Sequence, residues 1–328
     1  MSAGFDMELI LSRPYLTRKQ ITRAQRNTIP DLRVYTQKKL QVLKYLSDLC
    51  VYMLLPRRTL ETTIYYYDRY HLFNVFETEM VYPLATACLL LSCKQTETIK
   101  KLNKICITSF RVRKVPNVTT EMVEALRKRA LQLELRILEA CSFDYRINNF
   151  LHIDECIVKA GKKISCSKEV CYVAWLIAYD VLKTDIMLVI PQHSIAVAVL
   201  KVAEDLLKTS NTAWNPDIYA ELSTDIKSVS EAYFEVVNFY INMFDSCELR
   251  SNFVAPPSGP APEITLKSFI DLKQEAGPEH GLDEVSNEMV DRDRLLAVDM
   301  HSQTVRERRH VLSRSLVMEE QKSLHQTS

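Results

Sequence analysis

Glycine is scarce in this sequence. The chain has five glycines in 328 residues, and between Gly4 and Gly259 the only one is Gly161. Loops that cradle phosphate groups need glycine, because their backbone approaches the ligand closely and adopts positive φ angles. No P-loop, G-x-G-x-x-G motif or kinase glycine-rich loop can be written here, and no G-x-S-x-G elbow occurs. We therefore expect no nucleotide-binding enzyme, although scarce glycine does not exclude every enzyme. Because the sequence also places no Ser/His/Asp or paired-carboxylate cluster, we expect no catalytic residues and no cofactor.

The sequence also lacks the signals of export and membrane insertion. It has no N-terminal apolar run of the signal-peptide type and no uninterrupted apolar run of about 18 residues. We therefore expect a cytosolic or nuclear protein whose nine cysteines are reduced thiols. Four of these cysteines lie in apolar helical patterns and are interpreted as small core residues. They are Cys88, Cys93, Cys141 and Cys171.

Signals for a metal site are weak. No C-x-x-C motif occurs, which argues against zinc ribbons and thioredoxin-type sites. His152 and Cys156 are four residues apart on a predicted helix, as two metal ligands could be. No second pair of ligands accompanies them, so we expect no bound metal.

Positive and negative charges nearly balance. The net charge is +1, so the molecule as a whole is not expected to be a general nucleic-acid binder. Two segments are nevertheless basic. From Arg13 to Lys44 there are nine Lys/Arg and one acidic residue, Asp31, and from Lys100 to Lys114 there are six Lys/Arg. Each segment is either a solvated helical face or a surface that docks a partner.

The most apolar stretch is PLATACLLLSCK, from Pro83 to Lys94. A helix that is apolar all round is buried all round, so we expect other helices to surround it. Pro83 suits the first position of a helix. Lys94 places a full charge at its end, where the side chain either reaches the surface or meets a partner.

Apolar residues recur at helical spacing in both halves, and no stretch alternates as a strand does. A short basic helix over residues 18–26, capped by Thr17, must lie on other elements, because it has little apolar surface. The five helices of the first half are expected at residues 36–53, after a cap at Thr59, in the central stretch, within residues 97–116, and at residues 120–141. Those of the second half are expected at residues 149–160 with Gly161 as the stop, at 168–182, after Pro191, at 214–222 and at 228–244.

These elements divide the chain into four predicted segments. Residues 1–34 form an N-terminal segment with the basic helix, residues 35–147 the first five-helix unit and residues 148–252 the second. Residues 253–328 contain the linker APPSGPAP, a short helix at residues 264–275 and a charged tail that we expect to be largely flexible. The predicted class is thus all-α, with two tandem repeats.

Glu134 is an unusual residue in the last helix of the first unit. It lies on the flank of an apolar stripe, four residues after Ala130 and four before Leu138. Arg127 and Arg136 are near enough in sequence to make it an ordinary flank carboxylate. The sequence pattern leaves a functional role open.

Three motifs, in order, resemble those of the cyclin family. TTIYYYDRYHLF (62–73) resembles the second cyclin-box helix, ATACLLLSCKQTET (85–98) the third, and LELRILEACSFDY (133–145) the fifth. The resemblance covers roughly residues 15–245 and implies a double cyclin fold. The substrate-docking M-R-A-I-L sequence of cell-cycle cyclins is absent.

A narrower resemblance is to the fungal cyclin subunits (beta subunits) of RNA polymerase II carboxy-terminal-domain kinase I, which are similar to cyclins K and T. It rests on SRPYLTRKQITRAQ and on the segments 111–115 and 306–311. This resemblance implies a nuclear regulatory subunit, without catalytic activity, that activates a cyclin-dependent kinase and promotes transcription elongation. It also implies a third small subunit, indirect association with RNA polymerase II, and no direct DNA binding. The basic segment 100–114 would then be a protein-partner surface.

The resemblance also assigns residues. Lys94 and Glu134 match the family's lysine and glutamate that hydrogen-bond the region of the kinase's regulatory C-helix, and Leu91, Leu138 and Tyr145 match its apolar contacts. The family has an arginine where this chain has Lys38 or Lys39, which leaves the partner of Asp68 open.

Two other functions fit the same fold. A Mediator-type cyclin is one. A general transcription factor that bridges DNA and polymerase is the other, although that family carries a zinc ribbon and this sequence has no C-x-x-C.

Overall fold

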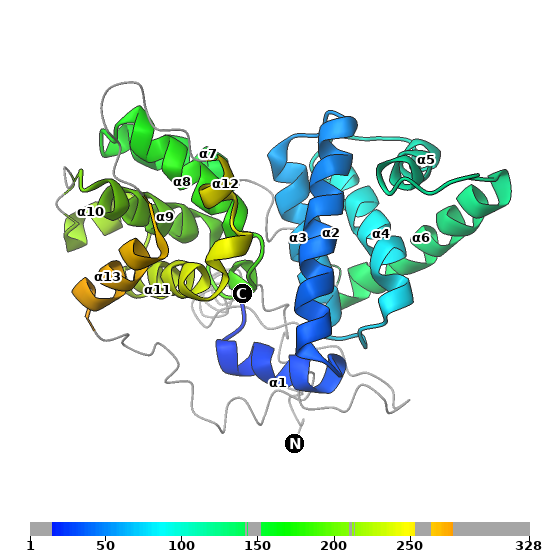
Figure 1. The fold of residues 1–328 in the computed structure, drawn as a ribbon, viewed down its shortest axis with the longest axis horizontal. Coiled ribbons are helices and arrows are strands. Elements are labelled where there is room, and N and C mark those ends of the chain that lie inside the picture. The colour runs from blue at the N-terminus through cyan, green and yellow to red at the C-terminus, as the bar shows by residue number, and fades with distance from the viewer. Residues whose placement is uncertain are drawn as a thin grey trace, which may run out of the picture.

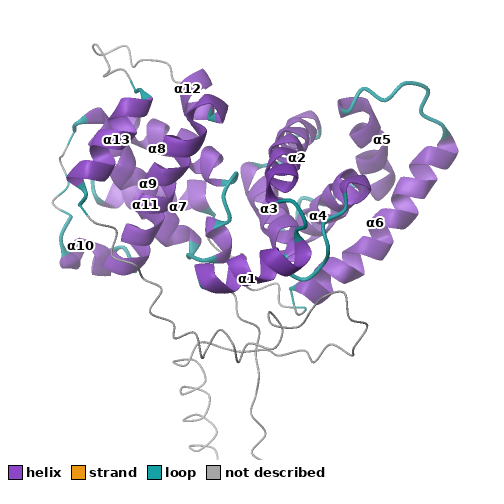
Figure 2. Cartoon of the chain, turned by 60° about the horizontal axis from the view of Figure 1, so that its bottom comes forward, coloured by secondary structure: helices purple, strands orange, loops and turns teal. Residues whose placement is uncertain are grey.

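The computed structural model describes residues 15–141, 143, 152–209, 212, 214–252 and 264–277. In these ranges every regular element is a helix and none is a strand (Figure 2), which confirms the all-α prediction. The predicted tail and most of the predicted connector at residues 143–148 lie outside the described residues.

The helices form two groups side by side, here called the first lobe and the second lobe (Figure 1). The first lobe contains α2 (Leu32–Tyr52), α3 (Arg57–His71), α4 (Val81–Gln95), α5 (Leu102–Val112) and α6 (Thr120–Ala140). The second contains α7 (Ile153–Lys163), α8 (Lys168–Val181), α9 (Gln192–Leu207), α10 (Pro216–Glu221), α11 (Ile226–Met243), α12 (Glu248–Asn252) and α13 (Leu266–Glu275). A further helix, α1 (Arg18–Thr28), lies below and between them (Figure 1).

One helix in each lobe is surrounded by its neighbours. α4 packs against α2, α3, α5 and α6, while α9 packs against α7, α8, α11 and α13. Every residue of α4 from Leu84 to Cys93 is buried. The structure therefore confirms that each half of the chain has a central apolar helix surrounded by other helices.

The first helix of the first lobe begins one turn earlier than predicted. Asp31 caps α2, and its Oδ1 accepts hydrogen bonds from the backbone N–H of Arg33 at 2.8 Å and of Val34 at 3.1 Å. Such caps satisfy N–H groups that have no partner within the helix. Leu32 and Val34 are exposed, so the apolar periodicity gave no sign of this first turn.

Two other predicted helix starts are wrong. Pro56 is the N-cap of α3, and Thr59 lies inside the helix with its side chain buried. Pro83 is the third residue of α4 rather than the first. The first four N–H groups of a helix have no intrahelical partner, so proline is tolerated at the third position as well as at the first.

Gly161 does not stop a helix as predicted, because α7 continues through it to Lys163. The glycine instead allows close packing against α8. A Cβ atom added at Gly161 would lie 2.7 Å from Cys171 Sγ, closer than real Cβ contacts.

The basic helix α1 lies on both lobes, as its low apolar content predicts. Arg18 at its start is 3.0 Å from Glu231 and 3.0 Å from Glu235, both on α11 of the second lobe. Thr28 at its end donates a 2.6 Å hydrogen bond from Oγ1 to the carbonyl of His71 in the first lobe. α1 thus connects the two lobes.

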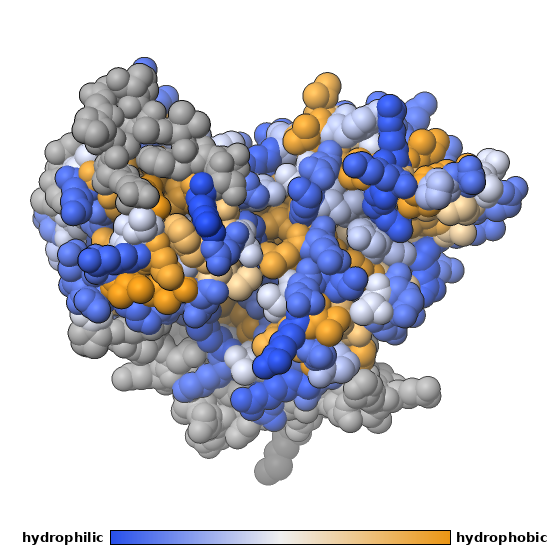
Figure 3. All heavy atoms as spheres, viewed as in Figure 1, coloured by the Kyte–Doolittle hydropathy of each residue, from blue (hydrophilic) through white to orange (hydrophobic). Residues whose placement is uncertain are grey.

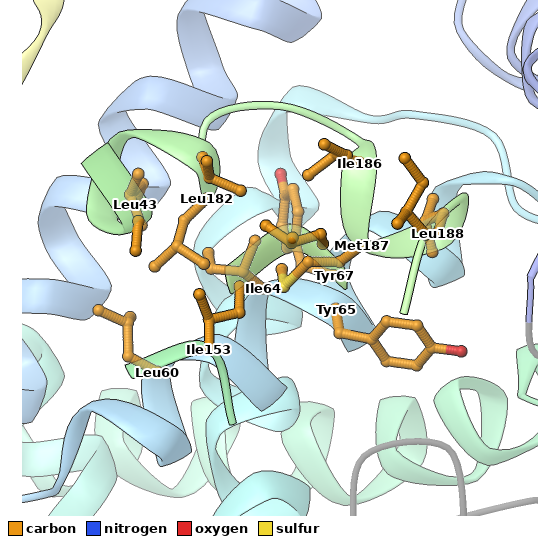
Figure 4. Close-up of a cluster of buried hydrophobic side chains, with 14 of the residues drawn as sticks. Leu43, Leu60, Ile64, Tyr65, Tyr67, Ile153, Leu182, Ile186, Met187 and Leu188 are labelled. Carbon is orange, nitrogen blue, oxygen red and sulfur yellow. The ribbon is translucent and has the colours of Figure 1, made fainter. Parts of the chain in front are cut away.

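The lobes also share a core (Figure 4). Its labelled side chains are Leu43, Leu60, Ile64, Tyr65 and Tyr67 from the first lobe and Ile153, Leu182, Ile186, Met187 and Leu188 from the second. All ten are buried. The continuous apolar contact fixes the lobes relative to each other.

A buried lysine adds an electrostatic link. Lys39 Nζ, on α2, lies 2.9 Å from Asp68 Oδ1 on α3 and 2.7 Å from Asp185 Oδ1 in the second lobe. It also donates to the carbonyl of Thr184 at 3.0 Å. The partner of Asp68, which the sequence left open, is therefore Lys39. Lys38 instead donates a hydrogen bond from Nζ to Gln41 Oε1 at 3.3 Å.

Candidate functional site

Lys94 and Glu134 meet at the surface of the first lobe. Lys94 is the penultimate residue of α4, and Glu134 lies on α6, which packs against it. Lys94 Nζ donates a 2.6 Å hydrogen bond to Glu134 Oε1. The lysine side chain is 52% exposed and the glutamate side chain 14% exposed. The two charges that sequence reasoning selected therefore form one solvent-accessible pair.

α6 carries apolar residues on two faces. The predicted inner stripe faces the core, and its members are buried: Val123, Leu126, Ala130, Leu133 and Ile137. A second stripe points outward, where Leu131 is 44% exposed, Leu135 is 55% exposed and Leu138 is half-buried. Glu134 lies on the same outward face, at helical spacing from Leu131 and Leu138.

Sequence reasoning missed Leu131 and Leu135. The available signal was the spacing of Leu131, Glu134, Leu135 and Leu138, which follows the i, i+3, i+4, i+7 pattern of one helix face. Because the inner stripe already accounted for burial of α6, this second stripe had to be exposed to solvent or to a partner. The apolar area beside the ion pair comes from these leucines.

The other predicted contact residues differ in their placement. Leu91 is 5% exposed and belongs to the core, so it presents little surface of its own. Leu138 is half-buried, packs against the core and borders the outward stripe. Tyr145 lies outside the described residues.

The turn after α4 is held by a cluster of hydroxyl groups. Thr59 Oγ1 lies 3.0 Å from the hydroxyls of both Thr96 and Thr98, which are themselves 3.0 Å apart. The N–H of Thr98 donates to the carbonyl of Cys93 at 2.9 Å. These bonds fix the end of α4, and with it the backbone from which Lys94 extends.

The chemistry of this surface is that of binding. A charge pair bordered by apolar side chains can offer a donor and an acceptor to a partner while the leucines are removed from water. Across the described ranges, no group of three or more His, Cys, Asp or Glu side chains could hold a metal ion. Cys156 is buried. His152, the N-cap residue of α7, has its Nδ1 atom 3.7 Å from Glu61 Oε2. The same carboxylate oxygen accepts a 3.1 Å hydrogen bond from the N–H of Ile153.

All nine cysteines lie in the described ranges, and none is in a disulfide. Burial raises the pKa of the Cys50 thiol to about 12, and the pKa of the Cys88 thiol rises well above its usual value for the same reason. Neither thiol is therefore a reactive thiolate at neutral pH. Of the helices described, none has the length and apolarity needed to cross a membrane.

A separate groove of about 710 Å³ lies between the lobes, lined by α2 and α8. Trp175 forms part of its wall, and the guanidinium of Arg57 lies 4.7 Å from the centre of the Trp175 ring. Neither Lys94 nor Glu134 lines this groove. Protein interfaces need no deep cavity, so the surface around the ion pair is the candidate site.

Comparison with known proteins agrees with this arrangement. The model of the family described as "Cyclin, N-terminal domain" matches residues 13–146. The CTD kinase subunit beta of Saccharomyces cerevisiae is 51% identical over 317 residues, covering 97% of this chain and 96% of that protein. The subunit of the same name in Schizosaccharomyces pombe is 29% identical over 205 residues, covering 60% of this chain and 59% of that protein.

A solved structure is also similar. A chain in the crystal structure of the yeast RNA Pol II CTD kinase CTDK-1 complex superposes with a TM-score of 0.86 at 51% sequence identity. The match covers 96% of this chain and 100% of that one.

Proposed function

The chain belongs to the cyclin family and, within it, to the CTD kinase beta subunits, and from this membership we propose that it binds and activates a cyclin-dependent kinase. The proposed substrate is the C-terminal repeat domain of RNA polymerase II, and the proposed outcome is the promotion of transcription elongation. This chain contributes a binding surface and no catalytic group.

The observation that carries the proposal is the exposed pair of Lys94 and Glu134 beside the outward leucines of α6. The 2.6 Å bond holds both side chains in one geometry before any partner arrives. Such preorganisation lowers the entropy lost on binding. The exposed areas of Leu131 and Leu135 supply apolar surface that a partner helix can bury. We propose that this helix is the regulatory C-helix of the kinase.

The proposed mechanism is a shift of population. A protein kinase is active when its strand lysine pairs with the glutamate of the C-helix, which requires the helix to be rotated inward. A cyclin that binds the inward state more tightly stabilises it in proportion to the difference in affinity. Raising the active fraction from about 1% to about 99% requires about 5.5 kcal/mol of differential binding. The rigid two-lobed surface can provide this without any chemical step.

The remaining parts of the proposal rest on family membership. We place the protein in the nucleus, in a complex with a third small subunit, and in contact with RNA polymerase II only through the kinase. The relative in Saccharomyces cerevisiae is a CTD kinase subunit and the similar crystal structure is that of a CTD kinase complex, which supports the kinase partner.

Substitution of the pair tests the proposal. Because Lys94 is 52% exposed, Lys94→Ala and Glu134→Ala should each change the free energy of unfolding little, by about 0–1 kcal/mol. In the complex both charges lose their water, so each substitution should weaken kinase binding by about 2–5 kcal/mol. Calorimetric melting of the free chain and titration with the purified kinase measure the two effects separately.

A matched control lies on the same helix. Glu124 and Arg127 on α6 form an exposed pair at 2.8 Å, so Glu124→Ala makes the same chemical change ten residues before Glu134, beyond the other end of the outward stripe. This variant should bind and activate the kinase as the wild type does. The assignment is refuted if Lys94→Ala and Glu134→Ala still activate the kinase fully, or if both melt far below the wild type.

A further inference from the structure

The basic segment 100–114 forms a positively charged surface on α5 and its flanking turns. From residue 98 to residue 118 the sequence contains six basic residues and no acidic one. Lys101, Lys104, Arg111 and Lys114 are exposed, and Lys100 and Arg113 are half-buried. Among the described residues, none of the six makes an ion pair. We call this set the α5 basic surface.

Two of its guanidinium groups are held in place by tyrosine rings. Arg111 stacks over Tyr52 at the end of α2, with 4.8 Å between the guanidinium carbon and the ring centre. Arg113 stacks over Tyr82 of α4 at 4.1 Å. A stacked guanidinium keeps its fork of N–H donors oriented, and this fork matches the oxygens of a phosphate group.

The position of this surface links it to the proposed kinase-binding site. α5 packs against both α4 and α6, the two helices that carry Lys94 and Glu134. Lys100 follows Lys94 by six residues, across the turn fixed by the threonine cluster. A chain bound to the α5 basic surface would therefore be held next to the docked kinase.

We propose that the α5 basic surface binds phosphorylated repeats of the polymerase II C-terminal domain, and so retains a substrate whose first repeats the kinase has already modified. This inference rests on the proposed function, which supplies the substrate. Each phosphate adds a charge of about −1.5 to −2 at neutral pH and three acceptor oxygens, so charge complementarity grows with every repeat that is phosphorylated. Retention raises the local concentration of the unmodified repeats at the kinase.

A protein ligand fits this surface better than a nucleic acid does. Single-stranded nucleic acids are held largely by stacking of bases on free aromatic faces. Here an arginine already stacks on the ring of Tyr52 and another on that of Tyr82. Exposed aliphatic side chains lie close by instead, with Ile107 on α5 52% exposed and Leu54, just beyond α2, 88% exposed. In the space-filling view an apolar group projects at the upper end of α2, and hydrophilic and apolar side chains lie side by side in the region of α5 (Figure 3).

The test is direct binding to the full-length chain. The probe is a fluorescein-labelled synthetic peptide of several polymerase repeats, prepared with and without one phosphoserine in each repeat. We expect the phosphorylated peptide to bind the wild-type chain about tenfold or more tightly than the unphosphorylated one. The triple variant Lys104→Glu, Arg111→Glu, Lys114→Glu should lose this preference.

A control variant carries the same change of charge elsewhere. Lys159, Lys162 and Lys168 are exposed on α7 and α8 of the second lobe, and their reversal to glutamate should leave the preference intact. In the reconstituted kinase complex, the α5 variant should phosphorylate a single-repeat peptide at the wild-type rate. On the multi-repeat peptide the α5 variant should accumulate singly phosphorylated products, which the wild type converts to multiply phosphorylated products.

Three outcomes would overturn the inference. The first is equal binding of both peptides by the wild type, or an unchanged preference in the α5 variant. The second is loss of kinase from the α5 variant on size-exclusion chromatography, which would make this surface part of the kinase interface. The third is tighter binding of a uridine-rich RNA oligonucleotide than of the phosphopeptide at the same salt concentration. Because peptide binding is measured on the chain alone, failure of wild-type kinase assembly would count against the proposed function only.

Discussion

Replacing Lys39 by methionine tests how the two lobes are held together. The ammonium group has three acceptors within 3.0 Å, namely Asp68 Oδ1, Asp185 Oδ1 and the carbonyl of Thr184. Methionine fills a similar volume but leaves the carboxylates without a counter-ion. Removing one partner of a buried ion pair lowers the free energy of unfolding by roughly 3–5 kcal/mol. The side chain of Lys39 is 5% exposed and that of Asp68 2% exposed, whereas that of Asp185 is 27% exposed, so a loss within this range and not above it is expected.

The two carboxylates should not contribute equally. Burial raises the pKa of Asp68 to about 7, although Lys39 opposes the shift. For Asp185 burial is the largest single influence and raises the pKa. The charge of Lys39, hydrogen bonds from Lys39 and Gln25, and the charge of Arg18 together outweigh it, so the net shift is downward. Asp185 is therefore the main counter-ion at neutral pH, and Asp185→Asn should destabilise more than Asp68→Asn. Lys39→Arg keeps the charge and serves as the conservative control.

The dependence on pH follows from the direction of the Asp68 shift. Its pKa is raised in the folded chain, from 3.8 to about 7, so the folded state binds the proton more tightly than the unfolded state. The stability that protonated Asp68 contributes is complete below its unfolded pKa and is lost as the pH rises through about 7. Without Lys39 the Asp68 carboxyl would be even harder to ionise, because Lys39 lowers its pKa. Lys39→Met should therefore destabilise less at acidic pH than at alkaline pH.

Urea unfolding at two pH values, one on each side of the raised pKa, measures these effects. The midpoint and slope of the transition give the free energy of unfolding for each variant. The reasoning fails if Lys39→Met loses less than about 1 kcal/mol at alkaline pH, since a buried unpaired carboxylate could not then be present. It also fails if Asp68→Asn destabilises more than Asp185→Asn at neutral pH.

Two further predictions concern packing and the thiols. Gly161→Ala should lower the free energy of unfolding by about 1–3 kcal/mol, because the added methyl group would meet Cys171 Sγ at 2.7 Å. In the same urea assay, the double variant with Cys171→Ala should recover most of this loss. Alkylation of the native chain at neutral pH should leave buried thiols such as Cys50 and Cys88 unmodified, whereas all nine should react after denaturation, as counted by mass spectrometry. A reproducible crosslink between two cysteines would contradict the second prediction.

Much of the helical fold could be predicted because burial imposes a period on the sequence. The inner stripe of α6 shows this period, and α4 is apolar on every face; both are buried as expected. Helix ends were less predictable, because they depend on single side chains. Asp31 starts α2 before any buried residue appears, and Pro56, not the predicted Thr59, lies at the N-cap of α3.

The candidate site was predictable only in part. Lys94 and Glu134 stood out because each is a charge beside an apolar stripe, and the structure brings them to 2.6 Å. Leu131 and Leu135 were overlooked because a leucine on a helix is normally assigned to the core. That they are exposed could be known only once the inner stripe of α6 was seen to fill the core alone. The link from Lys39 to Asp185 joins residues 146 positions apart, which no local pattern reveals.

Two lysine–carboxylate contacts in the first lobe therefore have opposite consequences. The contact of Lys39 with Asp68 is buried inside the chain, out of reach of a partner, so it serves the fold. The contact of Lys94 with Glu134 is partly exposed, with the ammonium group of Lys94 in contact with solvent. Exposed pairs of this kind contribute little to stability, whereas the same charges contribute strongly to binding once a partner excludes water. The surface around Lys94 is consequently better explained by a partner than by the stability of the lobe that carries it.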